Sequence, residues 1–213
     1  MINESVSSKF VNFKKGLLIC LSGPSGVGKG TIIEALKLAG TPLTHSISIT
    51  TRQPRPGEID NVSYYFRSRE HFHELLETGE ILEHDEYCGN LYGTPRAPIE
   101  ALLAEGTDVI MDVTVPGSLE TIVNFPDAIS IFLLPPSFSE LRRRLTNRGT
   151  ESADVIEQRM KKAIYEVRQA AKFKYIIVNE DVNQTAKVIH HILDAERHRS
   201  ERCIGIEDYI LGR

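Results

Sequence analysis

Residues 23–31 of the chain read GPSGVGKGT, and they separate two apolar stretches. The run from Gly16 to Leu21 before them is short and uninterrupted, which is typical of a buried strand. The stretch from Thr31 to Leu38 after them has apolar residues at helical spacing, and Gly40 is a suitable helix stop. The sequence therefore predicts a strand, a glycine-rich loop and a helix in direct succession.

The loop has the composition of a phosphate-binding site. Its glycines allow successive backbone N–H groups to point at phosphate oxygens, and Lys29 adds a mobile cation. The spacing from Gly23 through Gly28 to Lys29 is that of a Walker A loop. Gly30 stands where Ser or Thr usually offers a hydroxyl to magnesium, so we expect Thr31 or a water molecule to take that place. The alternative, an ordinary glycine-rich turn, is disfavoured by the flanking strand and helix.

Three more apolar runs are predicted strands, at 108–115, 128–134 and 174–178. Each is bounded by turn or helix signals. Strands that alternate with helices imply a parallel α/β sheet, and a length of 213 residues favours one domain over 1–213.

Two segments interrupt this alternation. Residues 45–95 are rich in Ser, Thr, Tyr, Gly, Pro and charge, and they predict short strands around one helix near Arg69 to Glu77. Residues 137–171 predict two helices, the first of which begins with a capping box from Ser137 to Glu140. In the second helix we expect an apolar stripe formed by Val155, Met160, Ala163, Ile164 and Val167. The core is then expected at about 16–44, 96–136 and 172–197, with a tail at 198–213.

Composition excludes several classes of function. The formal net charge of −4 is unsuited to bulk nucleic-acid binding, so no nucleic-acid partner is expected. No apolar run approaches the roughly 20 residues that a membrane span needs. The three cysteines are widely separated and contain no CxxC pair, which argues against a disulfide framework and fits a reducing, cytoplasmic setting.

The stretch HSISITTRQPRPGEIDNVSYYF, at 45–66, offers a candidate site for a second phosphate. Arg52 and Arg55 flank Pro54, which restricts the backbone and can hold two guanidinium groups toward one point. Two forked cations and the hydroxyl of Tyr64 suit a small phosphate monoester. A solvated basic turn is the alternative.

Glu83, in ILEHDEYCGNLYGT at 81–94, is a candidate for base recognition. A carboxylate offers two adjacent acceptors, which match the N1–H and N2–H₂ donors of guanine and would face the bare N1 of adenine. Ser48 and Thr94 could serve the O6 side, and Tyr92 could reach the phosphate. Glu83 is therefore predicted to select guanine, unless it is a surface acid.

Five stretches resemble the guanylate kinase family and occur in the family's order: GPSGVGKGT, SITTRQPRPGE, YYF, ILEHDEYCGNLYGT and LRRRLTNRGT. The similarity runs from about Gly16 to about Leu193. It implies a P-loop α/β fold with a three-layer parallel-sheet core, an inserted mixed α/β GMP-binding subdomain at about 45–95, and a small helical lid at about 137–171. The implied reaction transfers the γ-phosphoryl group of ATP to GMP with Mg²⁺, giving ADP and GDP.

The resemblance also assigns roles to individual residues. The implied GMP contacts are Ser48, Arg52, Arg55, Tyr64, Glu83, Tyr92, Thr94 and Asp112. The implied ATP contacts are Gly23, Ser25, Gly26, Val27, Gly28, Lys29, Gly30, Thr31 and Asn179. Lys29 and the lid residues Arg144, Arg148 and Arg159 are the implied catalytic cations, and phosphoryl transfer depends mainly on positioning and such charges. Thr31 and Asp112 are the candidate indirect ligands of magnesium.

The chain departs from the family pattern at four positions. Thr114 stands where the family usually has a second acid, and Pro116 where it has a Gln. Asn61 and Ser63 replace the Gly and Asp common before the tyrosine. We expect these changes to raise the KM for GMP without loss of guanine preference.

Two other functions stay open as alternatives. Guanylate-kinase-like domains also serve as non-catalytic modules that bind phosphorylated peptides, but loss of Lys29 or of the lid arginines would be expected there. A related P-loop kinase for another phosphorylated acceptor would be favoured by loss of Glu83 and the YGT stretch. The oligomeric state is open, with a homodimer as one alternative, and the final dozen residues (RCIGIEDYILGR) could form a dimer contact, dock on the core or remain a tail.

Overall fold

A parallel sheet forms the centre of the computed structural model, which describes residues 15–87, 89–147 and 153–212. Its strand order is β2-β7-β1-β8-β9, and every neighbouring pair is parallel. The strands are β1 (Leu18–Ser22), β2 (Thr44–His45), β7 (Val109–Asp112), β8 (Ile129–Leu134) and β9 (Tyr175–Val178). The predicted parallel α/β core is confirmed.

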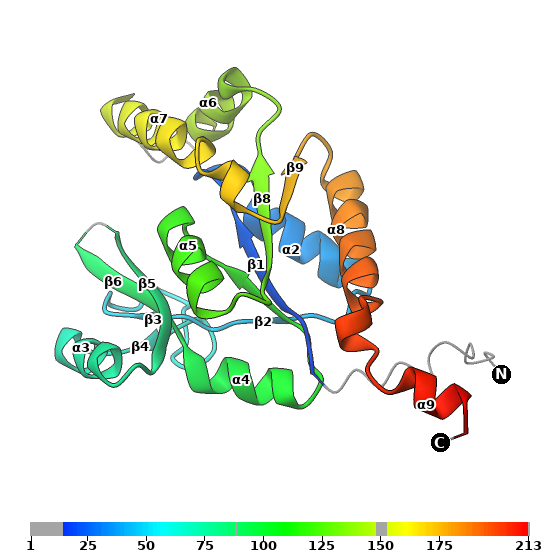
Figure 1. Ribbon diagram of the computed structural model, residues 1–213. Coiled ribbons are helices and arrows are strands. Elements are labelled where there is room, and N and C mark those ends of the chain that lie inside the picture. Colours follow the sequence, from blue (N-terminus) through cyan, green and yellow to red (C-terminus); the bar gives the residue numbers. More distant parts are fainter. Residues whose placement is uncertain (1–14, 88, 148–152, 213) are drawn as a thin grey trace.

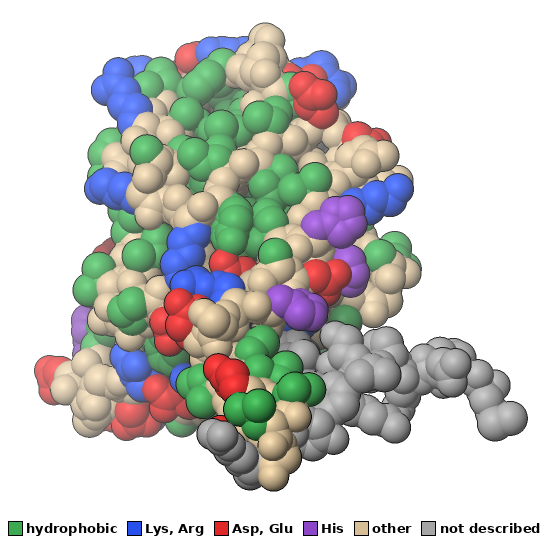
Figure 2. Space-filling view, turned by 45° about the vertical axis from the view of Figure 1, so that its right-hand side comes forward, with side chains coloured by type: hydrophobic (Ala, Val, Ile, Leu, Met, Phe, Trp, Pro, Cys, Tyr) green, Lys and Arg blue, Asp and Glu red, His purple; other side chains and the backbone are tan. Residues whose placement is uncertain are grey.

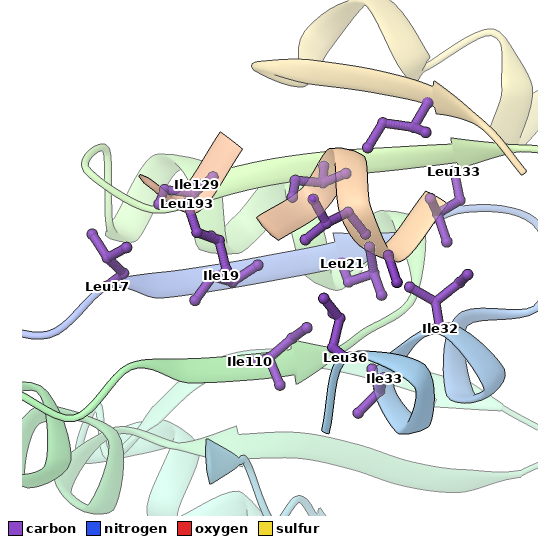
Figure 3. Packing of buried hydrophobic residues seen from close by; sticks show 14 of the residues in the cluster. Leu17, Ile19, Leu21, Ile32, Ile33, Leu36, Ile110, Ile129, Leu133 and Leu193 are labelled. Atoms are coloured by element: carbon purple, nitrogen blue, oxygen red, sulfur yellow. The ribbon is translucent and has the colours of Figure 1, made fainter. Parts of the chain in front are cut away.

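Helices cover both faces of this sheet, which gives three layers (Figure 1). Alternate residues of β1 face opposite sides, so Ile19 and Leu21 pack toward one layer while Leu18 and Cys20 pack toward the other. The first layer contains α2 (Lys29–Leu38) and α8 (Val182–Arg197). The second contains α4 (Arg96–Ala104) and α5 (Val115–Asn124). Figure 3 shows Leu21, Ile32 and Leu36 meeting between β1 and α2.

A second sheet lies beside the core, with the order β4-β3-β6-β5. Its strands are β3 (Ile49–Thr50), β4 (Tyr65–Phe66), β5 (Ile81–Tyr87) and β6 (Asn90–Pro95). The helix α3 spans Arg69–Glu77, as the sequence predicts, and Ser68 caps it by accepting a hydrogen bond from the N–H of His71. Phe72 anchors α3 to this sheet, because its side chain is fully buried.

Two helices, α6 (Phe138–Thr146) and α7 (Ala153–Val167), form a helical hairpin near the carboxyl end of β8 (Figure 1). The predicted cap is confirmed, since the Ser137 hydroxyl accepts a hydrogen bond from the N–H of Glu140 at 3.1 Å. The expected apolar stripe of α7 is partly wrong. Val155 and Ile164 are 39% and 47% exposed. The buried face of α7 instead belongs to the hydrophobic cluster between the two helices, to which α7 contributes Ile156, Met160 and Ala163.

Two element boundaries differ from the prediction because of local capping. The strand predicted at 108–115 ends at Asp112, since the Thr114 hydroxyl accepts a hydrogen bond from the N–H of Gly117 and starts α5 at Val115. The helix predicted from Thr31 begins earlier, at Lys29, directly after the left-handed Gly28.

After α8 the chain continues through a short 3₁₀ segment, η2 (Ser200–Arg202), into a short helix, α9 (Ile206–Ile210), and another 3₁₀ segment, η1 (Ala170–Lys172), lies between α7 and β9. Hydrophobic side chains gather over this C-terminal segment in Figure 2. Ile204, Ile210 and Leu211 are 86%, 68% and 61% exposed, so these side chains do not dock on the core. Within the described ranges, no helix has the length and apolar character needed to cross a bilayer.

Candidate functional site

The glycine-rich loop follows β1 and ends at the first turn of α2, as the sequence predicts. Gly23, Gly26 and Gly28 have φ values of 147°, 88° and 105°, a region that favours glycine. A Cβ on Gly23 would lie 2.5 Å from the carbonyl oxygen of Leu133. The loop therefore needs glycine for both conformation and space, and it opens onto the N–H groups at the start of α2, where anions bind.

Lys29 and Asp112 come together at the carboxyl ends of the neighbouring strands β1 and β7. Lys29 Nζ lies 3.6 Å from Asp112 Oδ1 and 3.5 Å from the carbonyl oxygen of Gly23, to which it donates a hydrogen bond. Both side chains remain partly exposed. Thr31 is exposed in the first turn of α2, and a Cβ on Gly30 would meet open space. The ammonium group of Lys29 and the oxygen-bearing side chains of Asp112 and Thr31 thus lie at the same end of the sheet.

Asn179 and Arg144 hold the loop from outside. The amide Nδ2 of the buried Asn179 donates to the carbonyl oxygen of Val27 at 2.9 Å, and its Oδ1 accepts from Thr185 at 3.1 Å. Arg144 donates to the same Val27 oxygen at 3.1 Å and to the Asn179 carbonyl at 3.2 Å. Glu140 pairs with the Arg144 guanidinium at 2.8 Å, a partner that the sequence analysis missed although its i, i+4 spacing indicates it.

The other two predicted lid cations are Arg159 and Arg148. Arg159 lies on α7 and is partly buried. Arg148 lies outside the described residues.

A cavity of about 320 Å³ lies between the second sheet and the ends of β7 and α5. It brings together most of the residues predicted to bind the acceptor. Its lining comprises Ser48, Arg52, Arg55, Tyr64, Glu83, Asp85, Tyr92, Gly93, Asp112, Val113 and Thr114. Thr94, which was also predicted, lies fully buried behind Glu83.

Arg52 is held in place by Glu58 and by two aromatic rings. Its guanidinium donates to both carboxylate oxygens of Glu58, at 2.7 and 2.9 Å, and lies 5.1 and 5.7 Å from the ring centroids of Tyr64 and Phe66. The hydrogen bonds from Arg52 and from the N–H of Arg55 lower the pKa of Glu58 to about 2. Glu58, which fixes the turn that carries both arginines, was not predicted from the sequence.

Glu83 is a buried carboxyl group, only 4% exposed, at the inner end of the cavity. Thr94, its partner across β5 and β6, donates to Glu83 Oε1 at 2.7 Å. Burial raises the pKa of Glu83 to about 7, and the nearby carboxylates of Glu120 and Asp85 act in the same direction while Thr94 opposes it.

The start of α5 packs against this carboxyl group. A Cβ on Gly117 would lie 1.9 Å from Glu83 Oε2, so only glycine leaves room for the side chain in its present position. Thr114, a departure from the family pattern, lines the cavity and caps α5 through its hydroxyl. Pro116 lies in the first turn of α5, where a proline is well tolerated.

Asn61, another departure, has a φ of 64°. Asparagine tolerates this left-handed conformation better than other residues that carry a Cβ, which gives a physical reason for its replacing a glycine. Ser63 accepts a hydrogen bond from the N–H of Ile59 at 3.1 Å. Both residues stabilise the turn before Tyr64.

Comparison with known proteins identifies relatives along almost the whole chain. The guanylate kinase family profile matches residues 15–196. The guanylate kinase of Listeria innocua is 47% identical over 192 residues, covering 90% of this chain and 94% of the relative. That of Lactococcus lactis is 44% identical over 191 residues, covering 90% and 93%. The crystal structure of guanylate kinase from Anaplasma phagocytophilum has a TM-score of 0.73 at 34% identity, covering 94% of this chain and 96% of that one.

Proposed function

The chain belongs to the guanylate kinase family and transfers the γ-phosphoryl group of ATP to GMP, and we propose that the cavity beside Glu83 binds GMP while the glycine-rich loop binds ATP. One observation supports this division above all. The cavity collects a buried carboxyl group and two arginines, and Asp112 on its wall lies 3.6 Å from the loop lysine Lys29. An acceptor phosphate in the cavity would thus face the donor phosphates.

Glu83 would recognise the guanine base. Its ionised carboxylate can accept hydrogen bonds from N1–H and N2–H₂, and Thr94 holds one of its oxygens in place. Ser48, which lines the cavity, would serve the O6 side of the base, whereas the predicted contact of Thr94 with O6 would require its hydroxyl to turn away from Glu83. A site built on such paired polar groups can reject an analogue that lacks them by roughly 10⁴-fold.

Arg52, Arg55, Tyr64 and Tyr92 would bind the phosphate of GMP. All four line the cavity, and Tyr64 and Tyr92 pack edge-on at 6.2 Å between centroids. Arg52 already has a fixed direction, given by Glu58, so little side-chain entropy is lost when it binds a phosphate. We propose residues 45–95 as the GMP-binding subdomain on this basis.

On the donor side, the proposed ATP contacts are Gly23 and residues 25–31, with Lys29 on the outer phosphates. The predicted contact of Asn179 with ATP would be indirect, because its buried amide already bonds to Val27 and Thr185 and holds the loop. The helical hairpin would act as the lid, with Arg144, Arg148 and Arg159 as its cations. The transferred phosphoryl group spreads negative charge over its oxygens, so these cations would stabilise the transition state by position and charge. Closure of the hairpin would exclude water and limit hydrolysis of ATP.

Magnesium fits the ligands available at this site. Asp112 has a partly exposed carboxylate and Thr31 an exposed hydroxyl, both hard oxygen ligands. Mg²⁺ usually keeps several waters and takes its other ligands from substrate phosphates, so few protein ligands are needed. When bound, the ion would offset phosphate charge, and Asp112 and Thr31 would hold it through water.

The reaction is tested by offering ATP and magnesium with GMP, AMP, CMP or UMP and measuring ADP formation. Of these four acceptors, only GMP is expected to support turnover. The two alternatives make other predictions: a phosphopeptide-binding module would give no turnover with any acceptor, and a related kinase would prefer another one. Lys29 and Glu83 are both in place here, which disfavours both alternatives.

Replacing Arg52 with alanine should raise the KM for GMP about 30-fold, because a charged hydrogen bond to the phosphate is lost. The KM for ATP should stay within twofold. The matched control is Arg67→Ala, which removes a half-buried arginine of the same subdomain that pairs with Asp60 and does not line the cavity. Steady-state kinetics with each substrate varied in turn would measure both KM values. An equal increase in the KM for GMP in the two variants would contradict the assignment of Arg52 to the GMP phosphate.

GMP affinity should depend on pH through Glu83. The carboxylate must be ionised to accept two donors, and its pKa of about 7 lies above the usual value for Glu, so affinity should increase as pH rises through about 7. The ionised fraction grows from about one tenth at pH 6 to about nine tenths at pH 8, which predicts a gain of roughly tenfold. Calorimetric titration of GMP would measure it. Glu83→Gln keeps the titration of GMP itself, so an unchanged pH profile in that variant would contradict the prediction.

We propose a cytoplasmic enzyme, because Cys20 and Cys203 are both free thiols. A homodimer is one alternative for the oligomeric state, and light scattering over a range of concentrations would distinguish it from a monomer.

A further inference from the structure

The outer edge of the second sheet faces the core helix α5. Within the described ranges β5 is the outermost strand of that sheet, so the backbone N–H and C=O groups along its outer side need partners other than a strand. Two side chains of α5 supply them. Glu120 accepts a hydrogen bond from the N–H of His84 at 2.9 Å, and Asn124 Nδ2 donates to the carbonyl oxygen of Leu82 at 2.9 Å. The core helix thus takes the place of a neighbouring strand.

These two hydrogen bonds act on the two peptide groups that flank Glu83. The carbonyl of Leu82 belongs to the peptide group that ends at Glu83, and the N–H of His84 belongs to the one that begins there. Each peptide group is planar, so fixing both planes fixes the backbone dihedral angles of Glu83 and the direction of its Cα–Cβ bond. The hydrogen bonds from α5 therefore determine where the Glu83 side chain starts.

The strand β5 is irregular at this point. Ile81 pairs with Pro95 and Glu83 with Thr94, so β5 contains one residue more than β6 between the two pairs. Such a bulge interrupts the hydrogen bonds of the ladder and redirects the side chains next to it. Leu82 is fully buried in the main core, whereas Ile81 packs in the cluster of the second sheet. The bonds from α5 thus support β5 where pairing with its own sheet is disturbed.

A single face of α5 serves the Glu83 carboxyl group. Gly117, Glu120 and Asn124 follow one another at intervals of three and four residues, which places them on the same side of the helix. Gly117 leaves room for the carboxyl group, and the other two hold the backbone on either side of it.

We propose that Glu120 and Asn124 are positioning residues for guanine, which align the Glu83 carboxylate with the N1–H and N2–H₂ donors of the base. This inference rests on the proposed binding of GMP beside Glu83. Neither residue is part of the cavity lining, so each would act through Glu83 without touching the nucleotide.

The test compares binding of GMP with binding of inosine monophosphate (IMP), whose base keeps N1–H and O6 but lacks the 2-amino group. A displaced carboxylate loses two donors from GMP and only one from IMP. Glu120→Ala and Asn124→Asp should therefore each weaken GMP binding about tenfold and IMP binding at most about threefold, while ADP binding stays within about twofold. Calorimetric titration measures all three affinities. Working at pH 8 keeps Glu83, with its pKa of about 7, mostly ionised when the Glu120 charge is removed.

Conservative variants separate positioning from stability. Glu120→Gln keeps an oxygen that can accept from the His84 N–H, so it should bind GMP within about twofold of the wild type. Asn124→Asp keeps the side-chain size and removes only the donor, so the test holds even when an alanine variant does not fold. The matched control is Lys174→Ala. Lys174 donates to the carbonyl oxygen of Pro126 at 2.9 Å, just beyond α5 and outside the cavity lining, and its loss should leave the preference for GMP over IMP unchanged.

The proposal is overturned if either Glu120→Ala or Asn124→Asp retains the wild-type preference for GMP over IMP. It is also overturned if the affinities for GMP, IMP and ADP fall together in parallel with Tm, as they would for a purely structural role. Failure of the proposed acceptor site is distinguishable. A wild type that binds GMP and IMP equally would show that Glu83 does not recognise the 2-amino group, whatever the variants do.

Discussion

Replacing Lys29 with alanine is expected to lower kcat for GMP phosphorylation by about 10³-fold, the upper range for removal of one electrostatic contact to a transition state. Lys29 is the first residue of α2, and its ammonium group lies between the Gly23 carbonyl and Asp112. Among the described residues, Lys29 is the lysine that contacts both Gly23 and Asp112. The transferred phosphoryl group would therefore lose its nearest cation on the loop side.

The matched control is Lys37→Ala on the same helix. Lys37 is exposed and pairs with Glu34 at 3.0 Å, so its removal should change kcat by less than twofold. Both variants are compared with the wild type in single-turnover and steady-state assays of ADP formation, with Tm as a check on folding. A loss of less than tenfold in folded Lys29→Ala would contradict the role of this lysine in catalysis.

Much of the donor side could be predicted from the sequence because its signals are local. The glycine spacing, the strand before it and the helix after it all lie within about 25 residues, and the positive φ values of Gly23, Gly26 and Gly28 match the need for glycine. Ser137 caps α6 for the same reason, since donor and acceptor are three residues apart. Local structure of this kind can be predicted from the spacing of residue types along the sequence.

Contacts between distant segments could not be predicted in the same way. Arg197 on α8 pairs with Asp108 across 89 residues of chain, and no periodicity in the sequence indicates that these two residues meet. On α7 the buried residue is Ile156 and not the predicted Val155, because packing against Leu141 and Leu145 decides which face of the helix is buried. The role of Glu58 could have been predicted from the sequence, since it closes the turn that begins only six residues earlier at Arg52.

Gly117→Ala is expected to weaken GMP binding by at least about 100-fold while ADP binding stays within twofold. An alanine Cβ would lie 1.9 Å from Glu83 Oε2 and 3.0 Å from its carboxyl carbon, far inside any permitted contact. The carboxyl group cannot turn aside freely, because Thr94 holds its other oxygen at 2.7 Å. The acceptor pair that matches guanine would therefore be displaced, and a site that depends on paired polar groups loses most of its affinity when they are misplaced.

Loss of helix stability cannot account for this result, since the intrinsic effect has the opposite sign. Gly117 lies in the first turn of α5 and has no left-handed φ, so alanine suits its backbone and stabilises a helix by about 1 kcal/mol relative to glycine. Val123→Ala, an exposed position on the same helix, is the control that should leave GMP binding unchanged. Calorimetric titrations of GMP into Gly117→Ala, Glu83→Ala and the double variant complete the cycle. Because the glycine acts through Glu83, the double variant should bind no worse than Glu83→Ala alone, and additive losses would show that Gly117 serves the base by another route.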